Sequence, residues 1–401
     1  MNMGYNQKML GLGSKRSIIR EIFEYSKARA REIGAENVFD FSLGNPSVPA
    51  PAIVNETICS LLETENSVLL HGYTSAQGDL GVRTTIAESI KGRFGVPITP
   101  NHIYMTCGAA ASLSICLKAL IEEDSADECI VFAPFFTEYR VFIENAGGKM
   151  VVSMPVPDTF EIDVRDFEEK ITPNTKAVIL NSPNNPSGVV YSEETIKAVC
   201  EVLRRKSAEL GHVIYLIADE PYRELVYSDV EVPYLMNHYA NTLVCYSYSK
   251  ALSLPGERIG YIAVCPEMED GTSIYLAICG AGRSLGYVCA PSLFQQVIAR
   301  CVDAKVDVEI YRENRDLLYN NLTAYGYHCV KPDGAFYLFV KALEPDAHRF
   351  YERAKQHELL VVPCDDFGTP GYVRVAYCVD KARVLGALPA FEKLAQEYKN
   401  K

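Results

Sequence analysis

Short, continuously apolar segments alternate with amphipathic helical patterns through the first two thirds of the chain. Examples are CIVFA at 129–133, KAVIL at 176–180 and HVIYLIA at 212–218. A strand that is apolar on both sides must be covered on both faces, and successive βαβ units achieve this by placing helices above and below a parallel sheet. The sequence therefore predicts an α/β fold with a mostly parallel sheet.

The alternation extends from the N-terminal third to about residue 290. Strands are expected at 102–106, 129–133, 149–154, 176–180, 212–218, 242–247 and 261–265, and helices at 14–34, 53–63, 79–94, 109–122, 137–146, 163–170, 192–210 and 273–283. A long helical stretch over 291–325 then breaks the rhythm. The segments AFYLFVKA, LLVVP and YVRVAYC, with helices at 346–357 and 380–398, predict a smaller α+β unit. We expect an N-terminal segment (1–48) that packs with the small domain, a large domain (49–290) and a small C-terminal domain (291–401).

Charge and composition exclude several classes of function. A net charge of −12 argues against a nucleic-acid partner, which would require a basic face. The sequence has no run of 18 apolar residues and no secretory leader pattern, so neither a membrane protein nor a secreted one is expected. The 13 cysteines are scattered without CxxC or CxxH spacing, which predicts free thiols in the reducing cytoplasm and no metal site.

Glycine, aromatic, polar and charged residues follow the predicted strands directly. They are Gly108 after HIYMT, Phe135 and Phe136 after CIVFA, NSPNNPSG after KAVIL, DEPY after HVIYLIA, and Ser249 and Lys250 after TLVCYS. Ligands of open parallel sheets bind beyond the carboxyl ends of the strands. We therefore expect these side chains to form one site.

Lys250 stands in YSYSKALSLPGERIGY, among residues suited to a phosphate. A lysine amine attacks a carbonyl only when it is neutral, so a catalytic lysine needs a special environment. Ser247, Ser249 and Arg258 offer hydroxyl donors and a guanidinium fork. The helix that begins after Gly108 offers backbone N–H groups, and its small first residues allow a phosphate to approach closely. These first residues are Ala109 and Ala110.

Asp219 ends an apolar strand, where a carboxylate is costly unless it is paired. A protonated pyridine nitrogen would be such a partner. Tyr222 and Asn185 could hydrogen-bond to a phenolate oxygen of the same ring, and Phe136 could stack on its face. Each of these groups complements one edge or face of pyridoxal 5′-phosphate.

Nine motifs in order then show a resemblance to a known family. The chain resembles the class I/II aminotransferases of the fold-type I pyridoxal-phosphate-dependent family, with an aspartate aminotransferase-like pattern over roughly residues 14–398. The motifs are FSLGNPSVPAP, HGYTSAQGDLGVR, the turn at Gly108, PFFTEY, NSPNNPSG, ADEPY, SYSK with Arg258 and Gly260, GAFYLFV, and GYVRVAY. The resemblance implies the fold-type I architecture, a large domain and a smaller one.

The resemblance also implies a role for each matching residue. Lys250 corresponds to the Schiff-base lysine, Asp219 to the partner of the ring nitrogen, and Tyr222 and Asn185 to the groups that face the phenolate oxygen. The phosphate would be bound by Ala109, Ala110, Ser247, Ser249 and Arg258, and Phe136 stands where tyrosine or tryptophan is common. The residues Lys250, Asp219 and Tyr222 would be the catalytic ones.

Further implied roles concern the substrate and a second subunit. Arg374 corresponds to the arginine that binds the substrate α-carboxylate, with Asn185 and the Gly44 backbone beside it. Tyr73 corresponds to a tyrosine that reaches the phosphate in the neighbouring subunit, so a homodimer with shared active sites is implied. Arg283 lies 33 residues after Lys250, near the position of an arginine that binds the side-chain carboxylate of dicarboxylic substrates. The alternative for Arg283 is an ordinary helix-terminal arginine stabilised by the helix dipole.

The expected activity is transamination between an L-amino acid and a 2-oxo acid, with the aspartate/glutamate type as the candidate. Two alternatives remain open at this point. One is a pyridoxal-phosphate-dependent C–S β-lyase, and the other is a non-catalytic sensor or regulator that binds the cofactor.

Overall fold

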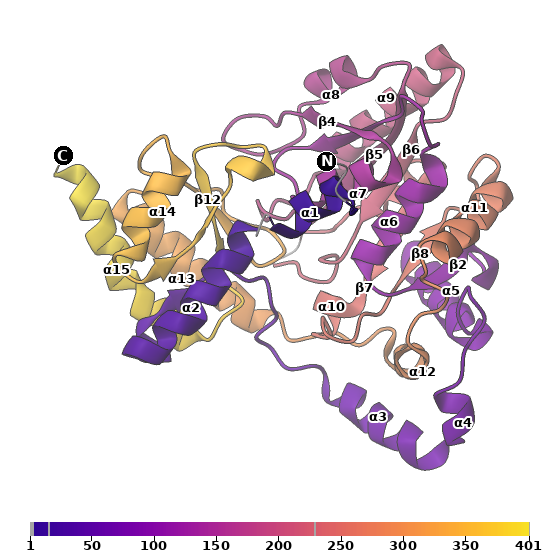
Figure 1. Ribbon diagram of the computed structural model, residues 1–401, viewed down its shortest axis with the longest axis horizontal. Coiled ribbons are helices and arrows are strands. Elements are labelled where there is room, and N and C mark those ends of the chain that lie inside the picture. The colour runs from indigo at the N-terminus through magenta and orange to yellow at the C-terminus, as the bar shows by residue number, and fades with distance from the viewer. Residues whose placement is uncertain (1–3, 15–16, 228–229, 401) are drawn as a thin grey trace. The chain divides into compact units, whose positions relative to one another are not determined.

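The computed structural model describes residues 4–14, 17–227 and 230–400 (Figure 1). The chain divides into two compact units. The larger unit comprises 46–309 and 332–335, and the smaller unit comprises 1–45, 310–331 and 336–401. Each unit is described by itself below.

A seven-stranded sheet forms the centre of the larger unit. Its order is β2-β8-β7-β6-β5-β3-β4, and β8 alone among these strands runs antiparallel to its neighbours. The strands are β2 (Ile103–Thr106), β3 (Glu128–Phe132), β4 (Lys149–Ser153), β5 (Thr175–Asn181), β6 (Tyr215–Asp219), β7 (Thr242–Ser247) and β8 (Gly260–Val264). Every residue of β2, β3, β6, β7 and β8 is buried, as their continuous apolar sequences predict.

Helices of the same unit cover this sheet. They are α3 (Ala52–Thr64), α4 (Ser67–Leu70), α5 (Leu80–Phe94), α6 (Ala109–Leu120), α7 (Glu138–Ala146), α8 (Val164–Lys170), α9 (Glu193–Leu210), α10 (Tyr248–Ala251), α11 (Gly271–Ser284) and α12 (Ser292–Cys301). Helix α6 packs on β6, β7 and β8, α7 and α8 pack on β4, and α5 packs on β2. Ser192 begins α9 by accepting a hydrogen bond from the Thr195 amide, and Gly211 ends this helix in the left-handed conformation.

The smaller unit joins the N-terminal part of the chain to its C-terminal part. A three-stranded antiparallel sheet has the order β11-β12-β9, and β1 pairs with β10 in parallel. Arg29 of α2 donates to Glu358 at 2.6–3.2 Å, which ties the first long helix to the segment before β10. The elements are α1 (Gln7–Ser14), α2 (Ile18–Ile33), β1 (Phe39–Asp40), α13 (Glu309–Tyr325), β9 (Tyr337–Lys341), α14 (Ala347–Lys355), β10 (Leu359–Leu360), β11 (Val362–Pro363), β12 (Tyr372–Ala376) and α15 (Lys381–Lys399).

The α/β class and the mostly parallel sheet are confirmed. The long helical stretch expected over 291–325 is two helices, α12 and α13, interrupted at 302–308. Helix α12 packs on α3 and α5, so it belongs to the larger unit, and the chain passes to the smaller unit after Glu309 instead of after residue 290. The helix expected at 14–34 begins at Ile18, because Ser17 is its N-cap.

Three short helices, α1, α4 and α10, are absent from the predicted set. No helix within 4–14, 17–227 and 230–400 is both long and apolar enough to cross a membrane.

Candidate active site

The registers of neighbouring strands bring the polar residues that follow them to one edge of the sheet. Asn181 of β5 lies opposite Asp219 of β6, and Asp219 lies opposite Cys245 of β7. Two residues later, Ser247 lies opposite Gly260, the first residue of the reversed strand β8. Thr106, the last residue of β2, lies opposite Gly260 on its other side. The ends of β2, β5, β6 and β7 therefore form one continuous edge, as the sequence predicts.

One carboxylate oxygen of Asp219 accepts a hydrogen bond, and the other has no partner within the described residues. The side chain is buried, and the Tyr139 hydroxyl donates to its Oδ2 at 2.5 Å. Oδ1 is also buried and has no hydrogen-bond partner within the described residues. Burial raises the pKa of Asp219 to about 7, the Tyr139 bond opposes this rise, and the nearby Glu220 adds to it. A cationic N–H donor at Oδ1 would satisfy this oxygen and keep the carboxylate ionised.

A buried ion pair between Glu220 and Arg223 stabilises the turn that follows Asp219. Glu220 accepts two hydrogen bonds from Arg223 at 2.5 Å each. Arg223 also donates to the carbonyls of Val232 and Pro233 at 3.0 Å each. Because the guanidinium is bound on several sides, the turn that carries the buried Tyr222 is held in one conformation.

The segment NSPNNPSG is tied to the strand of Asp219 through Asn181. The Asn181 amide donates to the Asp219 carbonyl at 2.8 Å, and its Oδ1 accepts from the Asn185 N–H at 2.7 Å. Asn184 Oδ1 accepts from both the N–H and the hydroxyl of Ser187, at 3.0 and 2.8 Å. The buried Asn185 is thus positioned by a side chain that also contacts the Asp219 backbone.

Two hydroxyls and a guanidinium meet after β7. Ser247 Oγ and Ser249 Oγ are 2.8 Å apart. Arg258 donates to Ser249 Oγ at 3.4 Å and to the Pro255 carbonyl at 2.9 Å, with its own backbone in the left-handed region (φ 52°). A Cβ placed on Gly108 would lie 2.8 Å from Arg258 Nη2, so the guanidinium lies against the start of α6.

Gly260 permits this close approach. A Cβ there would lie 3.1 Å from Gly108 Cα and 3.3 Å from Ser247 Cα, and it would overlap the Tyr246 carbonyl. The glycine therefore brings the N-terminus of α6, where Ala109 is half-buried and Ala110 exposed, next to the hydroxyls. Hydroxyls, helix N–H groups and a guanidinium together can hold a phosphate-sized anion. We call these residues the phosphate cup: Gly108, Ala109, Ala110, Ser247, Ser249 and Arg258.

Lys250 and Phe136 follow two strands of the same sheet, β7 and β3. Lys250 lies in α10 directly after the cup and is half-buried. Ser247 begins α10 by accepting from the Ser249 amide at 3.2 Å, so the cup and the lysine share one turn. Phe136 follows β3, is half-buried, and meets Tyr139 edge-on with ring centroids 5.7 Å apart.

Arg374 and Gly44 belong to the smaller unit, and both contact Tyr337. Arg374 is buried in β12, with its guanidinium carbon 4.5 Å from the Tyr337 ring centroid and 5.6 Å from that of Phe367. Its Nη2 donates to the Ser42 carbonyl at 2.7 Å. A side chain at Gly44 would overlap the Tyr337 hydroxyl. Arg374 and Gly44, both predicted to contact the substrate α-carboxylate, thus lie beside the same tyrosine.

Tyr73 and Arg283 are exposed, as are Ala110 and Arg258 of the phosphate cup, whereas Asp219 is buried. The Tyr73 side chain is 95% exposed and follows α4. Arg283 lies in the last turn of α11, the position that the helix-dipole alternative requires. In the described part of the chain, neither side chain has a hydrogen bond or an ion pair.

Sequence reasoning missed Tyr139 and Asn181, which both contact Asp219. Tyr139 stands three residues after Phe136 in PFFTEY, a spacing that places both on one side of a helical turn. That spacing was the available signal, although a buried tyrosine is more often a core residue. Asn181 ends β5 as Asp219 ends β6, so its position after an apolar strand could have identified it.

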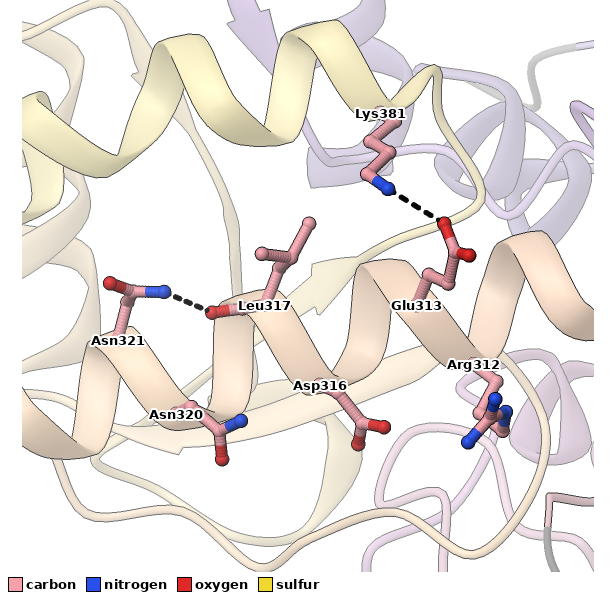
Figure 2. A pocket seen from close by; sticks show the side chains of 7 residues that line it. All are labelled: Arg312, Glu313, Asp316, Leu317, Asn320, Asn321 and Lys381. Carbon is pink, nitrogen blue, oxygen red and sulfur yellow. Dashed lines mark hydrogen bonds and ion pairs between the residues drawn. The ribbon is translucent and has the colours of Figure 1, made fainter.

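A hollow in the smaller unit contains none of the predicted residues (Figure 2). Its volume is about 370 Å³. Lys381 pairs with Glu313 at 2.8 Å, and Asp316 pairs with Lys331 at 3.1 Å, so its charges are largely neutralised within the chain. The lining residues are Arg312, Glu313, Asp316, Leu317, Asn320, Asn321 and Lys381. The described residues contain no cluster of three His, Cys, Asp or Glu side chains that could bind a metal ion.

Comparison with known families decides the kind of protein that carries this site. The family model for aminotransferase class I and II matches residues 36–391. The chain belongs to this family. It is therefore a transaminase, and the resemblance inferred from the nine motifs is confirmed.

The similarity to known proteins covers nearly the whole chain of this transaminase. An amino transferase from Eubacterium rectale has 56% identity and a TM-score of 0.97, with 100% of both chains covered. Aspartate aminotransferase from Thermus thermophilus with maleate has 27% identity and a TM-score of 0.85, covering 98% of this chain and 99% of the other. Aspartate aminotransferase of Thermotoga maritima is 29% identical over 92% of this chain and 94% of its own length. These relatives are named as aminotransferases, which favours transamination over the β-lyase and sensor alternatives.

Proposed function

We propose that this transaminase binds pyridoxal 5′-phosphate at the sheet edge and transfers the amino group of aspartate or glutamate to a 2-oxo acid. The observation that carries the proposal is the buried Asp219 Oδ1, which has no partner within the described residues. The cofactor's ring nitrogen, when protonated, is a donor of the required charge. The phosphate cup lies along the same edge, and its donors suit the cofactor's phosphate.

The bound cofactor would supply an electrophilic aldehyde and a ring that accepts electrons. Asp219 would hold a proton on the ring nitrogen, since an ionised carboxylate favours the cationic ring. Tyr222 and Asn185 would hydrogen-bond to the phenolate oxygen, and Phe136 would cover one ring face. Lys250 would bind the aldehyde carbon covalently.

Lys250 would also act as the general acid and base of the reaction. Its Nζ would take a proton from the substrate Cα and donate a proton back during the transfer. Arg374 would bind the substrate α-carboxylate, with Asn185 and the Gly44 backbone as further contacts. Its contacts with Ser42 and Tyr337 support this role, because they hold the planar guanidinium in a fixed orientation.

The dicarboxylic substrate is proposed from the relatives and from Arg283. The Thermotoga maritima relative is named as an aspartate aminotransferase, and the Thermus thermophilus structure is named as an aspartate aminotransferase with maleate, a dicarboxylate. Arg283 is exposed, so its guanidinium is available to a second subunit. We propose that it binds the substrate's side-chain carboxylate in the neighbouring subunit.

A homodimer is proposed from exposed apolar side chains on the larger unit. They are concentrated on α3, α4 and the segment that follows, and on α11 and the turn after it: Leu62, Val68, Leu69, Tyr73, Leu276, Tyr287 and Val288. Large apolar side chains at this exposure are typical of a surface that another protein covers. We propose that a second copy covers them and that Tyr73 reaches the phosphate in that copy. Light scattering tests this: a dimer has twice the mass of the chain.

A cytoplasmic location is proposed from the cysteines. All 13 lie in described residues and are free thiols, including Cys116 and Cys245, whose sulfur atoms are 3.7 Å apart. Free thiols in such proximity suit a reducing compartment. Retention of all 13 thiols in protein isolated under alkylating conditions tests this proposal.

The half-reactions test the proposed function as a whole. Purified protein loaded with pyridoxal phosphate is mixed with aspartate, and its absorbance is followed. We expect conversion to the pyridoxamine form and its reversal by a 2-oxo acid. Pyruvate and ammonia from a β-substituted amino acid would support the β-lyase alternative instead, and an unchanged spectrum with every amino acid would support the sensor.

A further inference from the structure

Tyr139 connects two parts of the site that lie on different strands. It belongs to the first turn of α7, three residues after Phe136, and its N–H donates to the Phe136 carbonyl at 3.0 Å. Its side chain is 2% exposed, and its hydroxyl reaches Asp219 Oδ2 at the end of β6. One helical turn after β3 therefore positions both the ring-stacking residue and a contact to the carboxylate.

The phenol is the donor in this bond. Burial and the neighbouring Asp219 carboxylate raise the pKa of Tyr139 well above its usual value, so the hydroxyl keeps its proton. It can therefore neutralise part of the charge on Oδ2 without competing for the proton of a ring nitrogen at Oδ1. The bond at 2.5 Å is short, as expected for a donor to an ionised oxygen.

The bond also limits how the carboxylate can rotate. Oδ2 is fixed by Tyr139, and the Asp219 backbone carbonyl is fixed by Asn181. Oδ1 is consequently the oxygen left to receive a ligand, and it is buried without a partner among the described residues. Glu220, whose charge disfavours ionisation of Asp219, is paired with Arg223. Tyr139 is therefore the group that directly favours the ionised form of Asp219.

We propose that Tyr139 is the positioning residue of Asp219: it fixes the carboxylate so that Oδ1 receives the ring nitrogen, and its hydrogen bond keeps this carboxylate ionised. The inference rests on the proposed function, because it assumes that pyridoxal phosphate binds at Asp219. Tyr139 itself touches no reacting atom. It acts on the cofactor through Asp219.

Tyr139→Phe removes the hydroxyl and keeps the ring. We expect cofactor affinity to fall about tenfold to a hundredfold, as for the loss of one hydrogen bond to a charged group. We also expect the ¹⁵N resonance of ring-labelled cofactor to move toward the unprotonated position, because an uncompensated carboxylate retains more of the shared proton. The KM for the amino acid should change less than kcat.

Tyr239→Phe is the matched control. Tyr239 is also buried in the larger unit, and its hydroxyl donates to the Ile214 carbonyl at 2.8 Å, just before β6 begins. This variant loses a hydrogen bond at the other end of the same strand, so a general loss of stability would appear in it too. We expect it to leave the cofactor affinity and the ¹⁵N shift unchanged. If Tyr139→Phe does not fold, Tyr139→Gln, which retains an N–H donor, serves as the second variant, with a smaller ¹⁵N change expected.

A wild-type ¹⁵N shift together with wild-type affinity in a folded Tyr139→Phe or Tyr139→Gln protein would overturn the inference. Equal losses in Tyr239→Phe would overturn it as well, because they would indicate a general effect of stability. Failure of the proposed function is distinguishable, since wild-type protein itself would then bind no cofactor or show an unprotonated ring nitrogen.

Discussion

Asp219 and the pair Tyr73 and Arg283 belong to the same unit, yet their surroundings are opposite. Asp219 is buried, and its contacts come from Tyr139 and Asn181 of the same chain. Tyr73 and Arg283 are exposed and have no side-chain polar partner in the described residues. The surroundings of Asp219 are thus built by a single chain. The proposed roles of Tyr73 and Arg283, in contrast, require a second subunit.

This difference separates the residues on which the proposed chemistry depends from those on which substrate choice and cofactor affinity depend. A low-dielectric surrounding strengthens the electrostatics at Asp219, so the proposed chemistry depends on groups whose positions are fixed by folding. Exposed residues gain such strength only when a partner excludes water from them. We therefore expect substitutions at Asp219 to abolish the chemistry, and substitutions at Arg283 and Tyr73 to affect substrate choice or cofactor affinity, and only in the dimer.

Asp219→Asn should have the largest effect in this comparison. The amide keeps the shape of the side chain and loses its charge, so the ring nitrogen is no longer held cationic. We expect kcat to fall roughly a hundredfold to a thousandfold, the range for removal of one preorganised electrostatic partner. Steady-state kinetics with aspartate provide the measurement, and near-normal turnover would rule out Asp219 as the ring-nitrogen partner.

The same substitution should stabilise the cofactor-free protein at neutral pH. Burial raises the pKa of Asp219 to about 7, from about 3.9 in an unfolded chain. Between these values the folded state holds the proton more tightly, so this group makes the wild type less stable as pH rises from about 4 to 7. We expect Asp219→Asn to gain about 2–4 kcal/mol relative to the wild type over this range.

Thermal unfolding of both apoproteins at pH 5 and pH 8 measures this gain. The exposed Asp124→Asn variant is the control, and its offset from the wild type should be the same at both pH values. An offset of Asp219→Asn that does not grow with pH would show that the buried carboxylate is not the destabilising group.

Arg283→Ala tests whether the exposed end selects the substrate. A bidentate contact between a guanidinium and a carboxylate is worth about 1.5–3 kcal/mol, which is roughly ten- to a hundredfold in rate. We expect kcat/KM for aspartate to fall by this factor, with alanine or an aromatic donor unaffected. Arg300→Ala is the matched control, because Arg300 also lies exposed in the last turn of a helix, α12. Equal losses on all donors, or none, would leave Arg283 with the helix-dipole role.

Tyr73→Phe should have the smallest effect. It removes one hydroxyl that is proposed to contact the phosphate in the neighbouring subunit, so we expect cofactor affinity to fall roughly threefold to tenfold. Tyr5→Phe, an exposed tyrosine of the smaller unit, controls for the substitution itself. Unchanged affinity for pyridoxal phosphate in a dimeric Tyr73→Phe protein would confine Tyr73 to a packing role.

The edge of the sheet could be predicted because two local signals coincide there. Continuous apolar strands fix the direction of the sheet, and polar residues placed directly after them, such as Asp219 and Ser249, then fall on the same edge. The proximity of Ser247 and Ser249 at this edge was predictable for the same reason. The close approach of Gly108 and Ser247 to Gly260 was not predictable, because it depends on strand β8 lying between β2 and β7.

Other features depended on contacts that a pattern does not contain. The predicted small domain wrongly includes helix α12. An apolar stripe shows that a helix packs, but it does not show on which element the helix packs. Helix α1 has two glycines in eight residues and no buried residue, so neither propensity nor periodicity indicates it. The role of Tyr139 is not visible in the sequence pattern, because its hydrogen bond joins residues 80 positions apart.

Identification of the modified lysine tests the central proposal most directly. Wild-type protein is loaded with pyridoxal phosphate, reduced with borohydride, digested and analysed by mass spectrometry, with Lys250→Ala in parallel. We predict that the reduced cofactor is attached to the peptide containing Lys250, and that the variant folds, carries no such adduct and loses turnover by roughly a hundredfold to ten-thousandfold. An adduct on another lysine of the wild type, or normal turnover in Lys250→Ala, would contradict it.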